Sequence, residues 1–415
     1  MRTKYGHLTY CTNIHSGETW ADHFESIKKF IPQIKAQVSP HQPFGIGLRI
    51  SNQASLELIN PEVVKEFQHW LDQEDCYVFT MNGFPYGGFH HTIVKDAVHK
   101  PDWTTPERVD YTERLATILA ALLPPGMEGG ISTSPLSYRH WFNNEKKRRE
   151  ASSAGTMNIL QVVNHLVDLK KNTGKTIHLD IEPEPGGLIE NGREFIDWYE
   201  DELLPSGIAS FKEHLGMNEI IARETIREHV QLCYDVCHFA IGFEDAAITV
   251  KQLEAKGIKI GKIQISAALK AAIPANAEDC QLVMEAFGQF NEPTYLHQVV
   301  ALLSNGKLIQ YNDLPDALNN VNNDEAKEWR SHFHVPLFIK DYGMLQSTQQ
   351  DIINVLAIQQ ERPFTSHMEI ETYTWEVLPE ALKLPLGQSI VREMEWVTGL
   401  LNGEPSSKNT NNGHE

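Results

Sequence analysis

The chain has few cysteines and lacks the features that would direct it out of the cell or into a membrane. Its cysteines are Cys11, Cys76, Cys233, Cys237 and Cys280. None has CxxC spacing, so neither a disulfide framework nor a zinc ribbon is indicated. The N-terminus has no apolar signal region, and no run approaches about 18 apolar residues. We therefore expect a cytoplasmic protein that does not insert into a membrane.

Positive charge is also scarce. The chain has 36 Lys and Arg against 55 Asp and Glu, which gives a formal net charge of −19. No nucleic-acid partner is expected, because such binding depends on the neutralisation of phosphates. GxSxG and P-loop patterns are missing, and no cysteine and histidine arrangement indicates a thiol nucleophile. These absences exclude several common enzyme classes.

The chain does contain a regular alternation of short strands and longer helical patterns, with a hydrophobic content of 41%. Eight strands are predicted, at residues 8–14, 46–51, 77–81, 130–134, 177–181, 232–236, 262–267 and 368–372. Helical patterns lie between them at 19–37, 61–71, 106–122, 141–171, 188–214, 244–256 and 348–360. Eight strand and helix pairs predict an α/β fold, a (β/α)₈ TIM barrel. A doubly wound open sheet is the alternative, but no Gly-rich phosphate fingerprint follows any strand.

Two connections are unusually long. Residues 268–367 separate the seventh and eighth predicted strands and include a strand-like run at 332–338, so we expect an insertion there. The loop of the third unit, NGFPYGGFHHTIVKDAVHKPDW, is rich in Gly and aromatics and would lie at the barrel mouth, where substrates bind. We expect a single barrel domain over residues 1–401. The polar residues 402–415 are expected to be a disordered tail.

Carboxylates occur on strands that should be apolar. Residues 177–183, IHLDIEP, carry isoleucine and leucine on one face and His178, Asp180 and Glu182 on the other. Strands of a parallel sheet are usually apolar on both faces, so this face needs an explanation, and the usual one is a metal or catalytic site. We expect Glu182 at the barrel mouth. His178 and Asp180 would lie deeper, as supports.

The same face of the other strands is polar too. It carries Asn13, Arg49, Asn82, Ser134, Glu182, Asp235, Gln264 and Glu371. Structural barrel layers are usually branched aliphatics, so this ring predicts a polar cavity at the mouth. Glu369 lies one layer below Glu371 and would be an ion-pair partner or a support for the ligands.

Two motifs add histidines. In CYDVCHFAIGFED, Asp235 would end the sixth strand and His238 would lie in the following turn, within reach of one cation or two adjacent ones. Alternatively, Asp235 caps a helix and His238 is a loop histidine. In WRSHFHVPLF, His332 and His334 share one face, which suits zinc or manganese. The alternative is two core histidines bonded to backbone carbonyls.

The order of these residues resembles the xylose isomerase-like barrel superfamily, which includes sugar isomerases, sugar epimerases and endonuclease IV-type AP endonucleases. Those barrels have a Glu at the end of strand five, an Asp, often within DxxH, at the end of strand six, a His on strand seven and a Glu at the end of strand eight. The matching residues here are Glu182, Asp235 with His238, Gln264 and Glu371. CYDVCHFAIGFED is similar to the DTCHxFAAGYD stretch of the endonuclease branch, and HFH lies where that branch has DxH.

The chain departs from that pattern at two places. Gln264 replaces the strand-seven histidine, and MNGFPYG and STSPLS replace the histidines that the endonucleases supply from strands two to four. The resemblance therefore implies a one- or two-metal site rather than a trinuclear zinc site. Over nearly the whole chain, GHLTYCTNIHSGETW, PFGIGLRIS, FPYGGFH, WRSHFHVPLF and HMEIETYTWEVLP are similar to the metabolite traffic protein EboE family. That resemblance implies a functional link to the other proteins of the Ebo operon.

The sequence thus predicts a divalent-metal-dependent isomerase or epimerase for a small sugar-like or cyclic polyol metabolite. The proposed ligands of Zn, Mn or Mg are Glu182, Asp235, His238, His334 and Glu371, with Gln264, His332 and Glu369 as further ligands or supports. Glu182 and Glu371 would be the catalytic base and acid. The substrate would contact Asn13, Trp20, Arg49, Asn82, Phe84, Phe89 and Lys340. The alternatives are a metal-dependent hydrolase of phosphate or ester bonds and a non-catalytic metabolite-binding protein.

Overall fold

The computed structural model describes the chain except for residues 89–92, 321–324, 376–377, 379–382, 384 and 404–415. Its centre is a nine-stranded sheet in the order β1-β2-β15-β8-β7-β6-β5-β4-β3, parallel throughout except between β1 and β2. The strands are β1 (Arg2–Thr3), β2 (Gly6–Tyr10), β3 (Phe44–Leu48), β4 (Cys76–Asn82), β5 (Gly129–Thr133), β6 (Ile177–Ile181), β7 (Val230–Asp235), β8 (Ile260–Ile265) and β15 (His367–Ile370). The tail expected to be disordered lies, from residue 404 onward, outside the described part of the chain.

The two ends of the sheet, β2 and β3, meet mainly through one side chain. Thr9 Oγ1 donates to Gly45 O at 2.7 Å and accepts from Gly47 N at 3.0 Å. A single parallel bridge between Cys11 and Gly47 adds to this contact. The sheet is therefore nearly closed, and the predicted (β/α)₈ barrel is confirmed against the open-sheet alternative.

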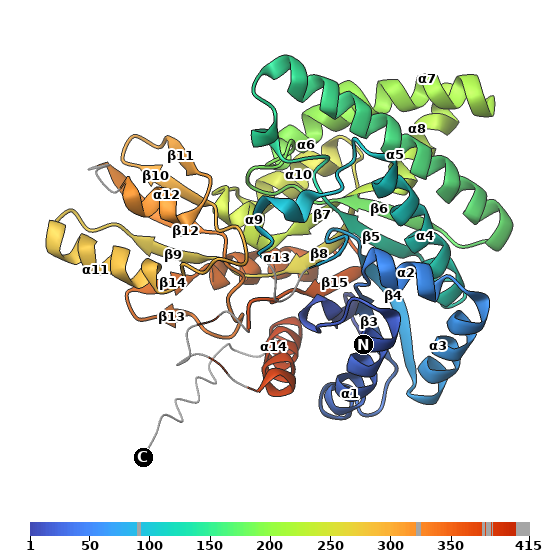
Figure 1. The fold of residues 1–415 in the computed structure, drawn as a ribbon, viewed down its shortest axis with the longest axis horizontal. Coiled ribbons are helices and arrows are strands. Elements are labelled where there is room, and N and C mark those ends of the chain that lie inside the picture. The colour runs from blue at the N-terminus through green and yellow to red at the C-terminus, as the bar shows by residue number, and fades with distance from the viewer. Residues whose placement is uncertain (89–92, 321–324, 376–377, 379–382, 384, 404–415) are drawn as a thin grey trace.

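Helices surround the barrel (Figure 1). They are α1 (Trp20–Val38), α2 (Asn52–Leu58), α3 (Pro61–Gln73), α4 (Pro106–Leu122), α5 (Glu145–Thr173), α6 (Gly192–Trp198), α7 (Leu204–Leu215), α8 (Glu219–His229), α9 (Val236–Ile241), α10 (Ala246–Ala255), α13 (Gln349–Glu361) and α14 (Leu386–Leu401), with shorter turns η1 (Thr12–Ile14), η2 (Lys95–His99), η3 (Arg139–Trp141) and the π-helical η4 (Tyr199–Leu203). Within the described residues, no helix combines the length and apolar character needed to cross a bilayer.

All eight predicted barrel strands are present, with shifted ends. The first was predicted to reach residue 14, but β2 ends at Tyr10 because Thr12–Ile14 forms a 3-10 turn. The helix predicted from residue 141 begins at Glu145, because the side chain of Asn144 caps it by accepting from Lys147 N. Both differences reflect local hydrogen bonds that override the apolar pattern.

The insertion between β8 and β15 forms a second sheet to one side of the barrel (Figure 1), antiparallel in the order β11-β10-β12-β9-β14-β13. Its elements are β9 (Leu269–Ala272), α11 (Ala277–Gly288), β10 (Val299–Leu303), β11 (Leu308–Tyr311), α12 (Leu314–Asn319), β12 (Ala326–Ser331), β13 (Asp341–Tyr342) and β14 (Leu345–Ser347). The strand predicted at 332–338 is wrong. β12 ends at Ser331, and the chain then turns to the barrel, where Val335 N donates to Ala267 O at 3.0 Å.

Polar side chains fill the barrel below its mouth. Lys262 Nζ donates to Glu369 Oε2 at 2.7 Å, and both side chains are fully buried. The same amine donates to Met81 O and to Ser132 Oγ, each at 3.2 Å. A Cβ on Gly47 would lie 1.9 Å from Glu369 Oε1, so glycine leaves room for this carboxylate. Glu369 is therefore an ion-pair partner, one of the two roles expected of it.

Candidate metal centre

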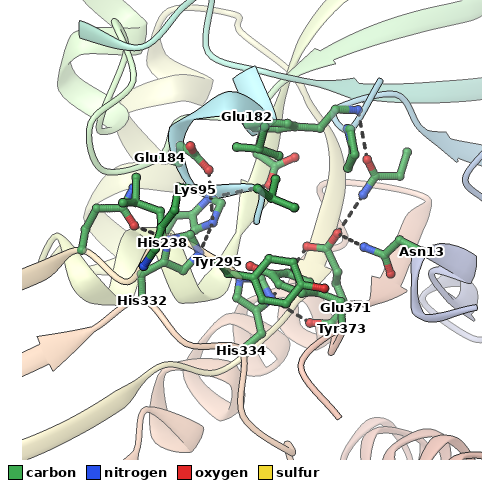
Figure 2. Close-up of a pocket in the computed structure, with 17 residues that line it drawn as sticks. Asn13, Lys95, Glu182, Glu184, His238, Tyr295, His332, His334, Glu371 and Tyr373 are labelled. Carbon is green, nitrogen blue, oxygen red and sulfur yellow. Dashed lines mark hydrogen bonds and ion pairs between the residues drawn. The ribbon is translucent and has the colours of Figure 1, made fainter. Parts of the chain in front are cut away.

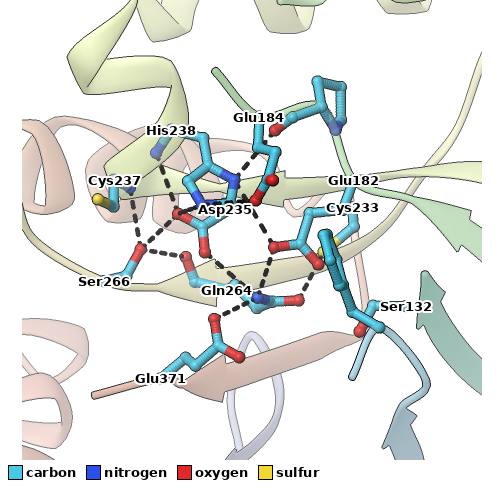
Figure 3. Close-up of polar contacts among 12 residues, drawn as sticks. Ser132, Glu182, Glu184, Cys233, Asp235, Cys237, His238, Gln264, Ser266 and Glu371 are labelled. Carbon is cyan, nitrogen blue, oxygen red and sulfur yellow. Dashed lines mark hydrogen bonds and ion pairs between the residues drawn. The ribbon is translucent and has the colours of Figure 1, made fainter. Parts of the chain in front are cut away.

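Three carboxylates converge where the barrel strands end (Figure 3). Glu182 follows β6, Asp235 is the last residue of β7, and Glu371 follows β15. One carboxylate oxygen from each residue lies within 4.8 Å of those of the other two. All three side chains are buried. The fold thus assembles, at one point, the three acidic residues that the sequence predicts as ligands.

The amide of Gln264 lies among these carboxylates (Figure 3). Its Nε2 donates to Glu371 Oε2 at 2.6 Å, to Glu182 Oε1 at 3.0 Å and to Asp235 Oδ2 at 3.2 Å. Its Oε1 accepts from the thiol of Cys233 at 2.8 Å, which favours this orientation of the amide. An amide nitrogen has no lone pair for a metal, whereas the amide turned by half a rotation would present its oxygen.

The carboxyl groups differ in their affinity for protons. Burial, followed by the charges of Glu371 and Asp235, raises the pKa of Glu182 well above its ordinary value. Burial and the charge of Asp235 likewise raise the pKa of Glu371 well above its ordinary value. Burial also acts to raise the pKa of Asp235, but His238 and His334 outweigh it and the net pKa is lowered. Of the three carboxyl groups, Glu182 and Glu371 therefore bind a proton more readily than Asp235 does.

Three histidines beside the carboxylates share one hydrogen-bonding pattern. Each ring donates its Nδ1 hydrogen to a carbonyl oxygen: His238 to Pro183 O at 3.0 Å, His332 to Gln298 Oε1 at 2.7 Å and His334 to Glu371 O at 2.9 Å. Gln298 is held in this orientation because its Nε2 donates to Pro185 O at 2.7 Å. With the protons on Nδ1, each neutral ring keeps a lone pair on Nε2, the usual state of a metal-ligating histidine.

These lone pairs face one another and the carboxylates. The Nε2 atoms of His238 and His332 are 3.2 Å apart. Two ligands about 2.0 Å from a tetrahedral cation lie roughly 3.3 Å apart, so this spacing fits a shared cation. His334 Nε2 is buried and has no hydrogen-bond partner among the described residues. Ligand atoms of Asp235, His238 and His334 all lie within 4.8 Å of one another.

Burial also keeps two of these rings neutral. It lowers the pKa of His332 well below its ordinary value, with the neighbouring His238 acting in the same direction. Burial likewise lowers the pKa of His334. The bond of His334 to a backbone carbonyl matches the structural alternative for this motif. The structural alternative does not account for the Nε2 atom of His334, which is buried without a hydrogen-bond partner among the described residues.

Asp235 also has the structural role considered for it. Its side chain caps α9 by accepting from His238 N at 3.1 Å, and it accepts from Ser266 Oγ at 2.7 Å. His238 therefore lies in the first turn of α9, directly after the strand, and is not the loop histidine of the alternative interpretation. The cap fixes the spacing between the carboxylate and the imidazole, so capping and ligation are compatible.

A cavity of about 60 Å³ opens above these groups (Figure 2) and is lined by Glu182, His238, His332, His334 and Glu371 among others. Three of the predicted substrate contacts, Asn13, Asn82 and Phe84, line it too. Asn13 Nδ2 and Asn82 Nδ2 donate to Glu371 Oε1 at 2.8 and 2.7 Å. They therefore hold the carboxylate as well as forming the wall.

The other predicted substrate contacts are not brought to this cavity. Trp20 is buried in α1 against Phe24 and Phe67, because its indole is part of the packing of the helix ring. Arg49 is fully buried, 3.8 Å from Glu18. Lys340 is exposed on the insertion. Phe89 lies outside the described residues.

No protein-family model and no curated protein sequence matches the chain. Solved structures do match. A xylose isomerase-like TIM barrel protein from Mycobacterium smegmatis in complex with magnesium has a TM-score of 0.50 at 10% identity, covering 96% of this chain and 97% of that chain. This chain has the xylose isomerase-like TIM barrel fold.

Two further similar structures were found. The IolI protein with a bound zinc atom has a TM-score of 0.47 at 12% identity, with 96% of this chain and 99% of that chain covered. A xylose isomerase domain protein from Planctomyces limnophilus has a TM-score of 0.44 at 12% identity, with 90% and 91% covered. The reaction of this chain has to be argued from the chemistry of its own site.

Within this xylose isomerase-like barrel, sequence reasoning missed several cavity residues. Glu184 shares the alternation of Glu182 in the EPEP segment, so the signal for it was present; it pairs with His99 at 2.8 Å. Lys95 comes from the third loop and pairs with Asp313 of the insertion at 2.7 Å. Tyr295, Gln298 and Tyr373 also line the cavity, and no spacing in the sequence marks them.

The donor set fits a divalent cation. Carboxylate oxygens and unprotonated imidazole nitrogens are ligands of zinc and manganese, and carboxylates suit magnesium. Glu182 Oε2 and His334 Nε2 are both buried without a hydrogen-bond partner in the described part of the chain. Buried polar atoms of this kind normally have partners, so a ligand that accepts their lone pairs would complete the site.

Proposed function

We propose that this protein is a divalent-metal-dependent isomerase or epimerase that transfers a proton between carbons of a small sugar-like or cyclic polyol molecule. The carrying observation is that two buried carboxyl groups with raised pKa values, Glu182 and Glu371, line one cavity beside three imidazole lone pairs. Acid and base groups of this kind work best when their pKa values approach the working pH.

The cation would be held by Glu182, Asp235, His238, His334 and Glu371, with His332 in reach of the same position. When bound, Zn, Mn or Mg would polarise a carbonyl or hydroxyl oxygen of the substrate. Gln264 either keeps its hydrogen bonds to the carboxylates or turns its oxygen toward the cation. In both cases it sets the spacing of the acidic groups.

The chain's own residues divide the proton transfer. Glu371 receives hydrogen bonds from Asn13, Asn82 and Gln264, which stabilise its ionised form. Glu182 receives one from Gln264 through Oε1, and its Oε2 is unpartnered within the described residues. We assign the resting proton to Glu182 and the resting charge to Glu371. Glu371 would then accept a proton from one carbon while Glu182 delivers one to its neighbour.

The size of the cavity limits how the substrate enters. Its volume of about 60 Å³ holds about two water-sized groups. A sugar-sized ligand is larger than this space, and Val94 and Lys95 are among the residues that line it. Lys95 is well placed to respond to an anionic group, because its partner Asp313 belongs to the insertion.

We further propose that the reaction belongs to an Ebo-type metabolite pathway in the cytoplasm. The support for the pathway is the resemblance of five sequence segments to the EboE family. The cellular partners would be the other proteins encoded in the same operon.

Proton exchange from solvent tests this proposal directly. The purified protein, loaded in turn with Zn²⁺, Mn²⁺ and Mg²⁺, is incubated in D₂O with a panel of sugars and cyclic polyols, and carbon-bound deuterium is measured by NMR. We expect uptake with the wild-type chain and with Glu278→Gln, an exposed control on α11. Uptake should be lost in Glu182→Gln and Asp235→Asn. Fewer than about 0.1 equivalents of bound cation together with no exchange would exclude the enzyme.

One observation favours a metal-dependent hydrolase as the second candidate. Two groups of possible ligands share Asp235: one with Glu182 and Glu371, the other with His238 and His334. Two adjacent cations are typical of enzymes that cleave phosphate esters. Release of phosphate from sugar phosphates without deuterium uptake would favour this function. Binding of a metabolite with neither reaction would indicate a non-catalytic binding protein.

A further inference from the structure

A second set of possible ligands lies at the opposite, N-terminal end of the barrel. His178 is the second residue of β6, His367 is the first residue of β15, and Glu128 directly precedes β5. One ligand atom from each lies within 4.8 Å of those of the other two. The two histidines are only 1% exposed, whereas Glu128 reaches the surface.

The hydrogen bonds of His178 leave a metal-binding nitrogen. Its Nδ1 donates to Asp180 Oδ1 at 2.6 Å, so the neutral ring keeps its lone pair on Nε2. A carboxylate that orients a histidine in this way is a common support for a metal ligand. Both members of this pair, His178 and Asp180, are buried.

His367 is a buried imidazole with unused hydrogen-bonding capacity. Both of its ring nitrogens are buried and have no hydrogen-bond partner of good geometry among the described residues. The backbone of Glu128 lies near the ring and acts to raise the pKa of His367. Burial lowers that pKa well below its ordinary value, and His178 acts in the same direction. The rings of His178 and His367 stack with their centres 5.2 Å apart. His367 is therefore neutral and able to act as a ligand.

Two glycines make room for this arrangement. A Cβ on Gly261 would lie 1.9 Å from Asp180 Oδ1, and a Cβ on Gly130 would lie 2.6 Å from His178 Cε1. Any other residue at these positions of β8 and β5 would displace the His178 and Asp180 pair. The pair thus occupies a space that the neighbouring strands leave for it.

Of the three residues, Glu128 lines a pocket open to solvent, whereas the two histidines are buried and are not part of its lining. A pocket of about 430 Å³ lies at this end of the barrel and is lined by Glu128, Gly261 and Ser366 among others. Glu128 Oε1 accepts from Ser366 Oγ at 3.0 Å, which leaves Oε2 to face a ligand. The buried Lys262 acts to lower the pKa of His367, and its charge is paired with Glu369. A cation could therefore approach the histidines from the side of Glu128.

We propose that His178, His367 and Glu128 bind a divalent cation at the N-terminal end of the barrel, separate from the centre at the mouth. Two imidazoles and one carboxylate are a common ligand set for zinc, with an open position for water facing the pocket. The cation joins β5, β6 and β15, strands that are not all neighbours in the sheet. Its role is to stabilise the barrel, since this end rarely carries catalysis in such folds.

Zinc titration of the full chain tests this site independently of the mouth. The metal-stripped protein is titrated with Zn²⁺ in a background that disables the mouth, Asp235→Asn with His334→Ala, and bound zinc is counted by mass spectrometry. We expect about one equivalent of zinc in this background. Adding Glu128→Ala should weaken binding at least tenfold, while Glu278→Ala, at an exposed position of α11, should change nothing.

The wild-type chain supplies a second measurement should the background variant fold poorly. Glu128→Ala alone should lower total bound zinc by one equivalent and abolish part of the rise in Tm that zinc produces. Co²⁺ in place of Zn²⁺ should show a visible spectrum that changes in His367→Gln. If zinc stoichiometry and Tm are the same in wild type, Glu128→Ala and His367→Gln, the site does not exist.

Discussion

The Nε2 atoms of His238 and His332 lie 3.2 Å apart, although both rings donate their Nδ1 hydrogens to oxygens elsewhere. Two lone pairs at this separation repel each other, so a cation or a shared proton must lie between them. Burial opposes the proton, because it lowers the pKa of His332 well below its ordinary value. The pair is therefore a sensitive place to test for a bound metal.

Removing one member of this pair should weaken metal binding. We expect His332→Ala to raise the Kd for Zn²⁺ at the mouth by about tenfold or more, because one ligand or support is lost. His41→Ala, on the surface, is the matched control and should leave the Kd unchanged. Calorimetric titration of the metal-stripped proteins measures both constants. Equal Kd values for the two variants would show that no cation lies between His238 and His332.

Gln264 offers a gain-of-affinity test. Its Nε2 presents hydrogens to three carboxylates, whereas a histidine there could present a lone pair. We expect Gln264→His to tighten Zn²⁺ or Mn²⁺ binding about tenfold, since it adds a ligand. Gln264→Leu should weaken binding and destabilise the cation-free fold, because the carboxylates then lose their shared donor. Tighter binding by Gln264→Leu would show that the amide merely blocks the site.

Metal binding should release protons. Burial raises the pKa values of Glu182 and Glu371 well above the ordinary value, so these carboxyls bind protons more readily than free ones, whereas a metal ligand must be ionised. Affinity should therefore rise with pH through the range in which these groups titrate. Calorimetry in buffers of different ionisation enthalpy measures the number released, which we expect to be about one at pH 7. Glu182→Gln should release fewer, and an unchanged number would place the proton elsewhere.

The buried ion pair of Lys262 and Glu369 should matter for stability mainly when it is broken. Lys262→Met leaves an unpaired buried carboxylate and should cost about 3–5 kcal/mol in the free energy of unfolding. The double variant Lys262→Met with Glu369→Gln should lose less free energy of unfolding than Lys262→Met alone, because it leaves no unpaired buried charge. Urea unfolding of the three proteins gives the comparison. A double variant less stable than either single variant would contradict this account.

Glu393 should make stability fall as the pH rises. Burial raises its pKa to about 8, against hydrogen bonds from Thr372 and from Leu337 N. Between pH 4.5 and 8 the carboxyl is ionised in the unfolded chain and protonated in the folded chain. The free energy of unfolding therefore falls by up to about 1.4 kcal/mol for each pH unit across this range. Glu393→Gln removes that dependence and should gain stability relative to wild type from pH 5 to pH 8. A difference in free energy of unfolding between the two proteins that stays the same at all pH values would contradict this role of Glu393.

The barrel itself could be read from the sequence because each strand carries its own signal. Alternation of apolar and polar residues over 177–181 predicts β6 with the bounds that the structure shows. Pro106 and the apolar spacing after it likewise predict α4 correctly. Strand ends were less accurate where a local turn competes, as at Thr12. Local patterns are reliable where no long-range contact overrides them.

The candidate site was predictable for residues at strand ends and for the histidines of two motifs. Glu182, Asp235 and Glu371 meet because the carboxyl ends of parallel barrel strands share one mouth. Trp20 and Lys340 were expected there from residue type, and Arg49 from its place on the polar face of a strand, but none of the three lines the cavity. Residues brought by the third loop and the insertion, such as Lys95 and Gln298, have no periodic signal and could not be found.

The sequence by itself determined the (β/α)₈ barrel and the acidic residues at its mouth, because strand alternation and chain order are local properties. Only the tertiary structure decided which nitrogen of each histidine is available, since that depends on carbonyls from distant segments such as Pro183 O and Gln298 Oε1. It also placed His178 beside His367, 189 positions apart in the numbering, at the far end of the barrel. Closure of the sheet brings β6 and β15 across one interior, and no local pattern encodes that contact.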